Sequence, residues 1–305
     1  MLDRRTMDGR ATVSQGNRGS VFLEDARILA HEGHPGEQYV VRVLAPQAAR
    51  RAQPGSFAHV SCDPSVPMRR PLSIMRANAA AGWLEFLYKP RGHGLEMLAT
   101  RKPGETLSVL APIGHGFTID ASRPRLLALG GGVGIPPMIF LAETVRSERD
   151  LAPLVLMGSE VPFPFAIVES RLAVAGVRKP ATHAVALLEE WGVPSRLASN
   201  AGLAGAHRGY ITALARAWLE ALTAEQRAET QVFACGPTPM LKAAAKLARE
   251  FELPCQVALE EYMACGIGGC AGCTVLLQTP DGPAMKRVCV DGPVFDAQQV
   301  SYLAS

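Results

Sequence analysis

The stretch Leu126–Pro137, with the sequence LLALGGGVGIPP, decides the fold class of this chain. Four apolar residues form a short buried strand, four of the next five residues are glycines, and two prolines mark the start of a helix. A glycine-rich turn between a strand and a helix lets a pyrophosphate approach the backbone and the positive end of the helix. The spacing is not a strict G-x-G-x-x-G, so a tight structural turn without a ligand is the alternative interpretation.

The residues that follow continue this alternation of strands and helices. Short apolar runs indicate strands, and helical spacing of apolar residues indicates helices, at 138–147, 154–157, 212–222 and 231–234. Thr238 and Pro239 predict a further helix, with Thr238 as its cap and Pro239 at the first helical position, and Pro254 ends it. Alternating strands and helices predict an α/β domain with a parallel sheet, which we place at 122–252.

A second turn supports ligand binding at this predicted sheet. Cys235-Gly236-Pro237 follows the strand at 231–234 and precedes the helix that opens at Thr238. In a parallel sheet this turn and the glycine turn both lie at the carboxyl edge, where ligands bind.

Upstream of the glycine turn the pattern is entirely different. Short β-rich segments at 39–44, 57–62 and 83–87 are separated by Gly and Pro at hairpin-like intervals. This pattern predicts an antiparallel β-barrel or sandwich at 19–121. Residues 1–18 are polar and without periodicity, and we expect a disordered tail there.

Composition excludes several classes of protein. The 305 residues carry a formal net charge of only +3 and 6% aromatic residues, which argues against a nucleic-acid partner. With 48% hydrophobic and 19% charged residues, the chain is expected to build a sizeable core. The longest uncharged apolar stretch, 126–142, is interrupted by glycines and is shorter than the roughly 20 residues of a membrane span. The first 20 residues have no secretory signal, and an odd total of seven cysteines favours a reduced compartment, here the cytoplasm.

Four of these cysteines crowd into the last part of the chain, which we separate as a module at 253–305. Cys265-x4-Cys270-x2-Cys273 has the spacing of plant-type [2Fe–2S] ligands, and Cys289 follows after fifteen intervening residues. Strands at 274–279 and 284–290 around a turn predict a hairpin that returns Cys289 to the side of Cys273. A [2Fe–2S] cluster is the favoured interpretation. Structural zinc and free thiols are the alternatives.

With these motifs in place, the chain resembles the ferredoxin–NADP reductase superfamily, in which a flavin-binding barrel precedes a nicotinamide-binding α/β domain. It resembles more closely the electron-transfer subunits of NAD-linked dihydroorotate dehydrogenases, which add a C-terminal [2Fe–2S] module. The short gap before Cys289 favours this group over oxygenase reductases. The resemblance covers about residues 19–300.

The resemblance implies a role for each matching segment. Arg70 meets the FAD pyrophosphate, Ser73 lies near the flavin N5 and Leu72 stands where many reductases have a stacking Tyr. Cys235 lies near the nicotinamide, and Asn200, helped by Ser159 and Glu160, meets the adenosine ribose, so NADH is favoured over NADPH. The cofactor-binding residues expected by resemblance are Arg70, Pro71, Leu72, Ser73, Tyr88, Lys89, Gly92, Gly94, Gly130, Gly131, Gly132, Gly134, Pro136, Cys235, Gly236 and Pro237, and the expected cluster ligands are Cys265, Cys270, Cys273 and Cys289.

The activity implied by resemblance is electron transfer between NAD(H) and a partner enzyme through FAD and the cluster. Hydride transfer takes place on the flavin, so no side chain is expected as a general acid or base. The implied partner is a separate FMN-containing catalytic subunit, in pyrimidine biosynthesis, and Met263, Val294 and Phe295 are candidates for its docking face or for packing over the cluster. One alternative is a reductase subunit for another acceptor, such as a ferredoxin, a hydrogenase or a glutamate synthase-like partner. The other is a redox sensor that retains an inactive reductase fold.

Overall fold

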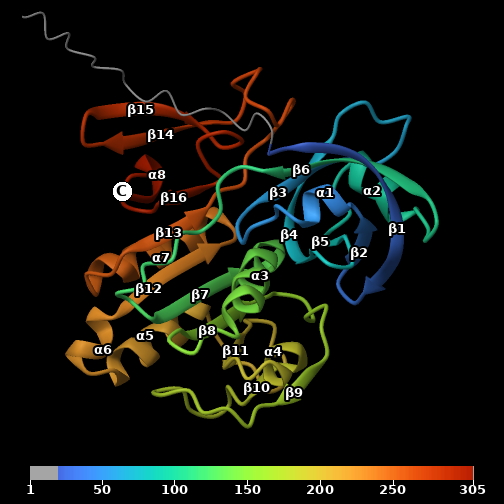
Figure 1. Ribbon diagram of the computed structural model, residues 1–305. Coiled ribbons are helices and arrows are strands. Elements are labelled where there is room, and N and C mark those ends of the chain that lie inside the picture. The colour runs from blue at the N-terminus through green and yellow to red at the C-terminus, as the bar shows by residue number, and fades with distance from the viewer. Residues whose placement is uncertain (1–19, 305) are drawn as a thin grey trace, which may run out of the picture.

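A computed structural model of the protein describes residues 20–304 (Figure 1). The expected disordered tail at 1–18 lies outside the described residues. The N-terminal part is a closed antiparallel barrel with the strand order β1-β2-β5-β4-β3-β6. Its elements are β1 (Phe22–His34), β2 (Gln38–Leu44), α1 (Pro46–Ala49), β3 (Phe57–Ser61), β4 (Arg70–Asn78), β5 (Trp83–Tyr88), α2 (His93–Ala99) and β6 (Thr106–Ile113).

The middle of the chain forms a six-stranded sheet with helices on its faces, in the order β11-β8-β7-β12-β13-β16. Five neighbouring strands run parallel, and only β16, at the edge, is antiparallel to its neighbour. The strands are β7 (Arg125–Gly131), β8 (Ala152–Gly158), β11 (Ser195–Ala198), β12 (Thr230–Cys235), β13 (Cys255–Ala258) and β16 (Val294–Asp296). The helices are η1 (Gly132–Gly134), α3 (Ile135–Val145), α4 (Ala186–Glu190), α5 (Ile211–Ala221), α6 (Ala224–Ala228) and α7 (Thr238–Glu250).

Three shorter pieces complete the fold. A two-stranded sheet of β9 (Ile167–Glu169) and β10 (His183–Val185) lies beside the six-stranded sheet. The C-terminal hairpin of β14 (Thr274–Thr279) and β15 (Gly282–Arg287) is followed by α8 (Ser301–Ala304). Figure 1 shows this hairpin above β13 and β16, with the barrel to the side. The expected barrel, parallel α/β domain and C-terminal cysteine module are therefore confirmed as the fold class.

Helix α3 joins the barrel to the sheet. Nine of its eleven residues are buried, because one side packs on β7 and β8 and another on β4 of the barrel. The Arg76 guanidinium of β4 donates to the Glu143 carboxylate of α3 at 2.6 Å. On the other side of the barrel, the backbone N–H of His115 donates to the Gly292 carbonyl at 2.6 Å. The barrel is thus held against both of its neighbours.

The first turn of α7 differs in detail from the expectation. Thr238 is the first helical residue, Pro237 precedes it as the cap, and no side chain caps the helix. Pro239 occupies the second helical position, where the N–H that it lacks would have had no partner within the helix. The helix therefore begins at Thr238, one residue earlier than the Thr-cap pattern predicts. Among the described residues, no helix is both long and apolar enough to cross a membrane.

Candidate functional site

Arg70 and the turn before α2 form the first candidate site. The Arg70 guanidinium lies over Gly94, and a Cβ at residue 94 would come within 2.8 Å of the guanidinium Cζ and Nε. Gly92 has a φ of +76°, which a glycine adopts without strain. The resulting cradle of backbone and positive charge suits an anionic diphosphate, so the residues present fit the pyrophosphate of FAD.

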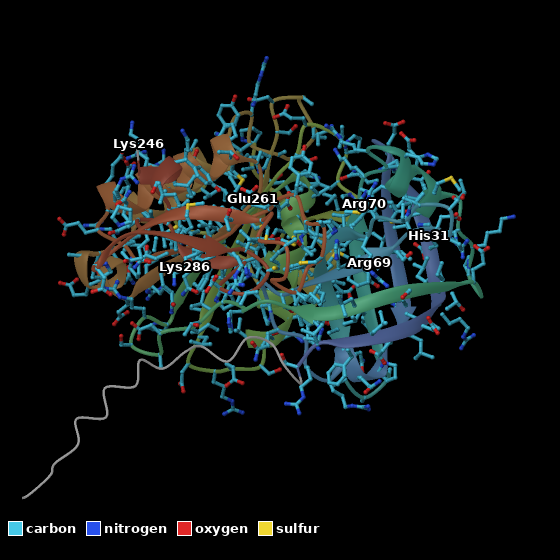
Figure 2. The ribbon with its side chains drawn as sticks, turned by 90° about the horizontal axis from the view of Figure 1, so that it is seen from above. His31, Arg69, Arg70, Lys246, Glu261 and Lys286 are labelled. Atoms are coloured by element: carbon cyan, nitrogen blue, oxygen red, sulfur yellow. The ribbon has the colours of Figure 1, made fainter. Side chains whose placement is uncertain are left out.

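The neighbouring Arg69 has different contacts from Arg70. Both arginines are labelled in Figure 2. Its guanidinium donates to the Ser108 carbonyl at 2.7 Å and to the Ser108 hydroxyl at 2.8 Å. Arg69 therefore braces the barrel wall at β6, whereas Arg70 turns toward Gly94.

The remaining expected flavin residues divide between the barrel interior and its outer face. Leu72 is buried in the barrel core, whereas Pro71 and Ser73 alternate with it and are half-buried. Tyr88 is also turned inward. Its ring stacks on Tyr39 with centroids 5.6 Å apart, and its hydroxyl lies 2.8 Å from His31 Nε2.

These placements limit what each residue can offer to a flavin. Ser73 is placed for a side-chain contact, while Leu72 and Tyr88 have only backbone to offer. Lys89 follows directly after Tyr88, and burial, together with the Arg91 charge, lowers its pKa.

The two turns at the carboxyl edge of the sheet touch each other. A Cβ at Gly134 would overlap the backbone carbonyl of Cys235, so the glycine turn and the Cys235-Gly236-Pro237 turn pack backbone to backbone. Gly132 has a φ of +57°, and a Cβ there would meet nothing within 4 Å. This open glycine backbone is where a dinucleotide can approach the edge.

The packing around this edge explains the other expected residues. Gly130 packs closely on the first residue of α3, and Gly131 on the Met240 side chain. Pro136 is buried in the first turn of α3, where N–H groups have no hydrogen-bond partner within the helix, so the N–H that proline lacks costs no hydrogen bond.

Two polar side chains from neighbouring strands meet at the same edge. Glu160 follows β8, and Asn200 follows β11. The Asn200 amide Nδ2 lies 3.4 Å from Glu160 Oε1. A carboxylate after the second strand of such a sheet can accept hydrogen bonds from the ribose hydroxyls and repel a 2′-phosphate. The structure therefore brings together two residues that the sequence placed forty positions apart.

Cys235 is a buried thiol at the end of β12. Burial raises its pKa well above the usual value, and the charge of Glu260 adds to the rise. Glu260 follows β13, whose residue Ala258 pairs with Cys235, so it belongs to the same carboxyl edge. Glu260 is not predictable from the local sequence, because the short strand before it joins the sheet only through its pairing with β12.

The four cysteines of the C-terminal module gather between the 265–273 loop and the hairpin. Cys273 Sγ and Cys289 Sγ lie 3.4 Å apart, so the predicted return of Cys289 beside Cys273 is confirmed. Among the described residues, no three His, Cys, Asp or Glu side chains converge closely enough to hold a single metal ion.

The electrostatics of these thiols fit a bound cationic group. Burial raises the pKa of Cys265, but backbone N–H groups of Ile267, Cys270 and Gly269 outweigh it and lower the pKa to about 7. Burial and the neighbouring Cys273 raise the pKa of Cys289 to about 12. Adjacent sulfurs cannot all become thiolates without positive charge between them, and backbone N–H groups aimed at sulfur are typical of iron–sulfur sites. The donor set and its surroundings therefore fit a cluster of iron and sulfide.

The apolar residues near the cysteines are divided into a packed and an exposed group. Met263 and Phe295 are buried in the same hydrophobic cluster as Cys273 and Cys289, which agrees with the packing alternative for these two candidates. Val294 is half-buried and packs against another hydrophobic cluster, which includes Ala258 of β13. Tyr262 is 94% exposed and Ile267 is 62% exposed. Neither exposed side chain was predicted, since the exposure of a residue near a cysteine loop leaves no local signal in the sequence.

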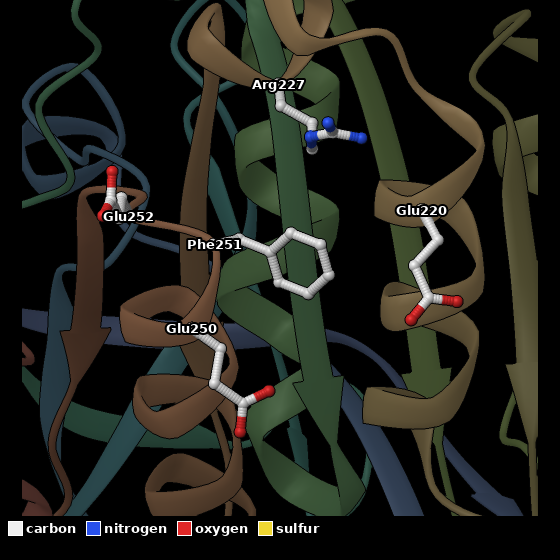
Figure 3. A pocket seen from close by; sticks show the side chains of 5 residues that line it. All are labelled: Glu220, Arg227, Glu250, Phe251 and Glu252. Atoms are coloured by element: carbon white, nitrogen blue, oxygen red, sulfur yellow. The ribbon is translucent and has the colours of Figure 1, made fainter.

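A large open cavity lies away from all of these residues. It has a volume of about 430 Å³ and is lined by Glu220, Arg227, Glu250, Phe251 and Glu252 (Figure 3). Its walls are the carboxyl-terminal ends of α5 and α7 together with α6. Helices of a parallel α/β sheet run opposite to the strands, so this cavity lies at the amino edge, remote from the two glycine turns.

His59 of β3 is a buried polar residue that the sequence pattern does not predict. Its side chain is fully buried, and neither ring nitrogen has a hydrogen-bond partner among the described residues. Burial lowers its pKa, and the Arg69 charge contributes to the decrease. The ring faces the cysteine loop, because a Cβ at Gly266 would come within 2.8 Å of His59 Nδ1.

Comparison with known proteins agrees with this geometry. A family model described as the iron–sulfur cluster binding domain of dihydroorotate dehydrogenase B matches residues 260–301, which include all four cysteines. In the fold, the chain is similar to a structure of an NADH-dependent reduced ferredoxin–NADP oxidoreductase, with a TM-score of 0.73, 23% identity, and coverage of 92% of this chain and 90% of that one. It is also similar to phthalate dioxygenase reductase, with a TM-score of 0.55, 15% identity, and coverage of 88% and 94%.

Two relatives extend the match over nearly the whole chain. The dihydroorotate dehydrogenase B (NAD(+)) electron transfer subunit of Caldanaerobacter subterraneus subsp. tengcongensis is 31% identical over 277 residues, which cover 91% of this chain and 98% of the relative. The subunit of the same name from a Geobacillus species is 32% identical over 287 residues, with the same coverage. The chain therefore belongs to the family of electron transfer subunits of dihydroorotate dehydrogenase B (NAD(+)).

Proposed function

We propose that this chain passes electrons between NAD(H) and the FMN-containing catalytic subunit of a dihydroorotate dehydrogenase, and so serves pyrimidine biosynthesis in the cytoplasm. The observation that carries the proposal is the seating of the cysteine loop on the barrel. Gly266 of that loop packs against His59 of β3, and β3 pairs with the strand that carries Arg70 and Ser73. A flavin on the barrel and a cluster in the loop would be neighbours within one chain.

The barrel is the proposed flavin domain, within 19–121. Arg70 and the backbone at Gly92 and Gly94 would hold the pyrophosphate, and Ser73 would face the isoalloxazine ring. FAD, when bound, exchanges a hydride with the nicotinamide and passes single electrons to an iron–sulfur cluster. The chain's contribution is to bind, to orient and to exclude water, and no side chain is needed as an acid or base.

The α/β part is the proposed nicotinamide domain, within 122–252. The open turn at Gly132 would receive the pyrophosphate of NADH, and the turn at Cys235 would face the nicotinamide. Glu160 and Asn200 would bind the adenosine ribose. A carboxylate at that position supports NADH as the substrate over NADPH.

The C-terminal residues, within 253–305, would hold the cluster through Cys265, Cys270, Cys273 and Cys289. Cys273 and Cys289 lie 3.4 Å apart, and the Cys270 side chain contacts Cys265. Two pairs of thiols, together with the match of residues 260–301 to an iron–sulfur domain, support a two-iron cluster over structural zinc.

The exposed side chains of Tyr262 and Ile267 are the proposed docking surface for the catalytic subunit. They flank the first cluster ligand, Cys265, on either side in the sequence. Large apolar side chains that are this exposed are typical of interaction sites when they lie together. Electrons leaving the cluster would have the shortest path to a partner that binds here.

The proposal is tested with the purified chain alone and then with a candidate FMN-containing subunit. We expect the chain to reduce ferricyanide with NADH, and to show no turnover of dihydroorotate until the partner is added. Dihydroorotate oxidation by this chain alone would contradict the proposal. Dye reduction without binding of any such partner would favour a reductase for another acceptor. Absence of flavin bands that bleach on addition of NADH would favour the redox-sensor alternative.

A further inference from the structure

Arg287 is a cationic side chain at the end of β15 that reaches the cysteine loop. Its guanidinium Nη1 donates to the Gly268 carbonyl at 3.0 Å. Gly268 lies in the loop between Cys265 and Cys270, and one residue separates Arg287 from Cys289. This hydrogen bond therefore ties the loop that carries the first proposed cluster ligands to the strand that leads into the last one.

Gly268 allows the loop to come this close to the hairpin. Its φ of +84° is a conformation that favours glycine. A Cβ at residue 268 would overlap Val290 Cγ2 and would come within 3.3 Å of Arg287 Nη1. The Gly268 carbonyl shares one peptide unit with the N–H of Gly269, which is among the backbone groups directed at the Cys265 sulfur. A hydrogen bond to this carbonyl thus orients a peptide that faces a proposed ligand.

Asp291 holds Arg287 from the other side. The backbone N–H of Arg287 donates to Asp291 Oδ2 at 2.7 Å, and Arg287 Nε lies 3.8 Å from the same oxygen. The Arg287 carbonyl accepts from the N–H groups of Val290, at 3.0 Å, and of Asp291, at 2.7 Å. These bonds close a turn around Cys289, so one set of contacts holds both the proposed ligand and the arginine.

The charge of Arg287 has a consequence for electron uptake. Reduction adds one electron to an iron–sulfur cluster, and a nearby positive charge stabilises the added negative charge. The Arg287 side chain is 41% exposed, so water weakens this stabilisation. Lys286, labelled in Figure 2, is the adjacent cation, but successive side chains of a strand point to opposite faces. The two residues therefore carry the same charge in different places.

We propose that Arg287 is a positioning residue of the cluster site, which fixes the Gly268 peptide against the hairpin and, by its charge, favours the reduced state of the cluster. This inference rests on the proposed function, because it requires a cluster at the four cysteines. The proposed flavin residues lie on the barrel, so flavin binding should not depend on Arg287.

Two substitutions and a matched control test the proposal. Arg287→Met removes the charge and the donor but keeps an extended side chain, whereas Arg287→Lys keeps the charge and one donor group. Lys286→Met is the control, because it removes the same charge from the adjacent position of β15. All variants are made in the full chain loaded with FAD and cluster.

Each variant is examined by a redox titration of the cluster followed by electron paramagnetic resonance, by amide hydrogen exchange at 267–270, and by its flavin content. For Arg287→Met we expect the ratio of reduced to oxidised cluster at a fixed potential to fall about threefold or more, where a tenfold change corresponds to about 59 mV for one electron. Amide exchange should become at least tenfold faster. Arg287→Lys should recover most of both losses, Lys286→Met should match wild type, and flavin content should not change.

The contrary outcomes are distinct. A wild-type potential in Arg287→Met, with or without faster exchange, would reduce the arginine to a structural brace and overturn the proposal. An equal fall in Lys286→Met, or no recovery in Arg287→Lys, would overturn it as well. If Arg287→Met loses its iron on purification, retention of iron at a wild-type potential in Arg287→Lys supports the proposal, and loss in both refutes it. Failure of the proposed function is recognised separately, as absence of iron or of NADH-bleached flavin in the wild-type chain.

Discussion

At the scale of single residues, we expect the choice between NADH and NADPH to depend on the charge at the carboxyl edge of the sheet. Glu160 and Asn200 converge there, with Asn200 Nδ2 3.4 Å from Glu160 Oε1. An amide can bind a ribose diol but does not repel a phosphate, whereas a carboxylate does both. Glu160 is therefore the residue on which discrimination between NADH and NADPH should depend.

We expect Glu160→Gln to reduce the preference for NADH over NADPH by about ten- to a hundredfold. The loss corresponds to roughly 1.5–3 kcal/mol for hydrogen bonds to a charged group. The measurement is the ratio of kcat/KM for the two nucleotides with ferricyanide as acceptor. Glu169→Gln, on exposed β9, is the control and should leave the ratio unchanged. An unchanged ratio in Glu160→Gln would move the specificity to another group.

Arg70 is the proposed pyrophosphate-binding residue, because its guanidinium lies over Gly94. Arg70→Ala should weaken FAD binding about ten- to a hundredfold, since it removes charge-assisted hydrogen bonds of roughly 1.5–3 kcal/mol. Flavin retained after dialysis, followed by its absorbance, measures the effect. Arg50→Ala, at the exposed end of α1, serves as the control. Retention as tight as in wild type would remove Arg70 from the pyrophosphate site.

At the scale of elements, the hairpin β14–β15 assembles the cysteine site. The two strands pair at six positions, from Thr274↔Arg287 to Thr279↔Gly282, so the end of β15 lies beside the start of β14. As a result, Cys289 Sγ lies 3.4 Å from Cys273 Sγ. The proposed cluster ligands thus depend on a hairpin that brings its two ends together, whereas the proposed flavin residues lie on the barrel.

Cys289→Ser should therefore remove or strongly destabilise the cluster while FAD remains bound. Iron and sulfide content per flavin is the measurement, with Cys62→Ser, in the barrel core, as the control that should keep full iron. Full iron occupancy with an unchanged visible spectrum in Cys289→Ser would exclude Cys289 as a ligand.

Much of this arrangement follows from local sequence, and the exceptions have a common cause. The strands at 126–129 and 231–234 and the cysteine hairpin were predictable, because each depends on the periodicity or turn chemistry of nearby residues. β13 and β16 were not assigned to the sheet, although β13 pairs with β12 and β16 with β13. These short segments are strands only because they pair with neighbouring strands of the sheet. The contact between His59 and Gly266 also joins segments that are far apart in the sequence, so no local pattern predicts it.

At the scale of the whole molecule, three contacts keep the parts in register. Arg76 pairs with Glu143 between the barrel and α3, Gln38 Nε2 donates to the Pro162 carbonyl at 2.7 Å, and Gly266 packs on His59. Electron transfer between two cofactors depends on the distance between them, and we expect these contacts to help hold that distance constant. The remaining step of the proposed function, from cluster to partner, needs the catalytic subunit.

Electron transfer to the partner should depend on the proposed docking surface of Tyr262 and Ile267. Both side chains are largely exposed, and truncation of a central aromatic or apolar anchor weakens an interface by about 2 kcal/mol or more, which is tenfold or more in affinity. We expect Tyr262→Ser combined with Ile267→Ser to weaken binding of the catalytic subunit at least tenfold and to slow NADH-dependent orotate chemistry accordingly. Ferricyanide reduction should not change, because a small dye needs no docking surface.

The matched control for this pair is Val168→Ser, which removes an exposed apolar side chain from β9, an element at the opposite end of the molecule in Figure 1 from the cysteine hairpin. Affinity is measured by titration of the partner, and iron content and the cluster spectrum are checked in the same preparation. If the double variant loses iron, its effect arises inside the cluster loop. If it keeps iron and binds the partner as wild type does, the docking surface lies elsewhere. Loss of binding with intact iron and intact dye reduction is the result that places the exit of electrons at Tyr262 and Ile267.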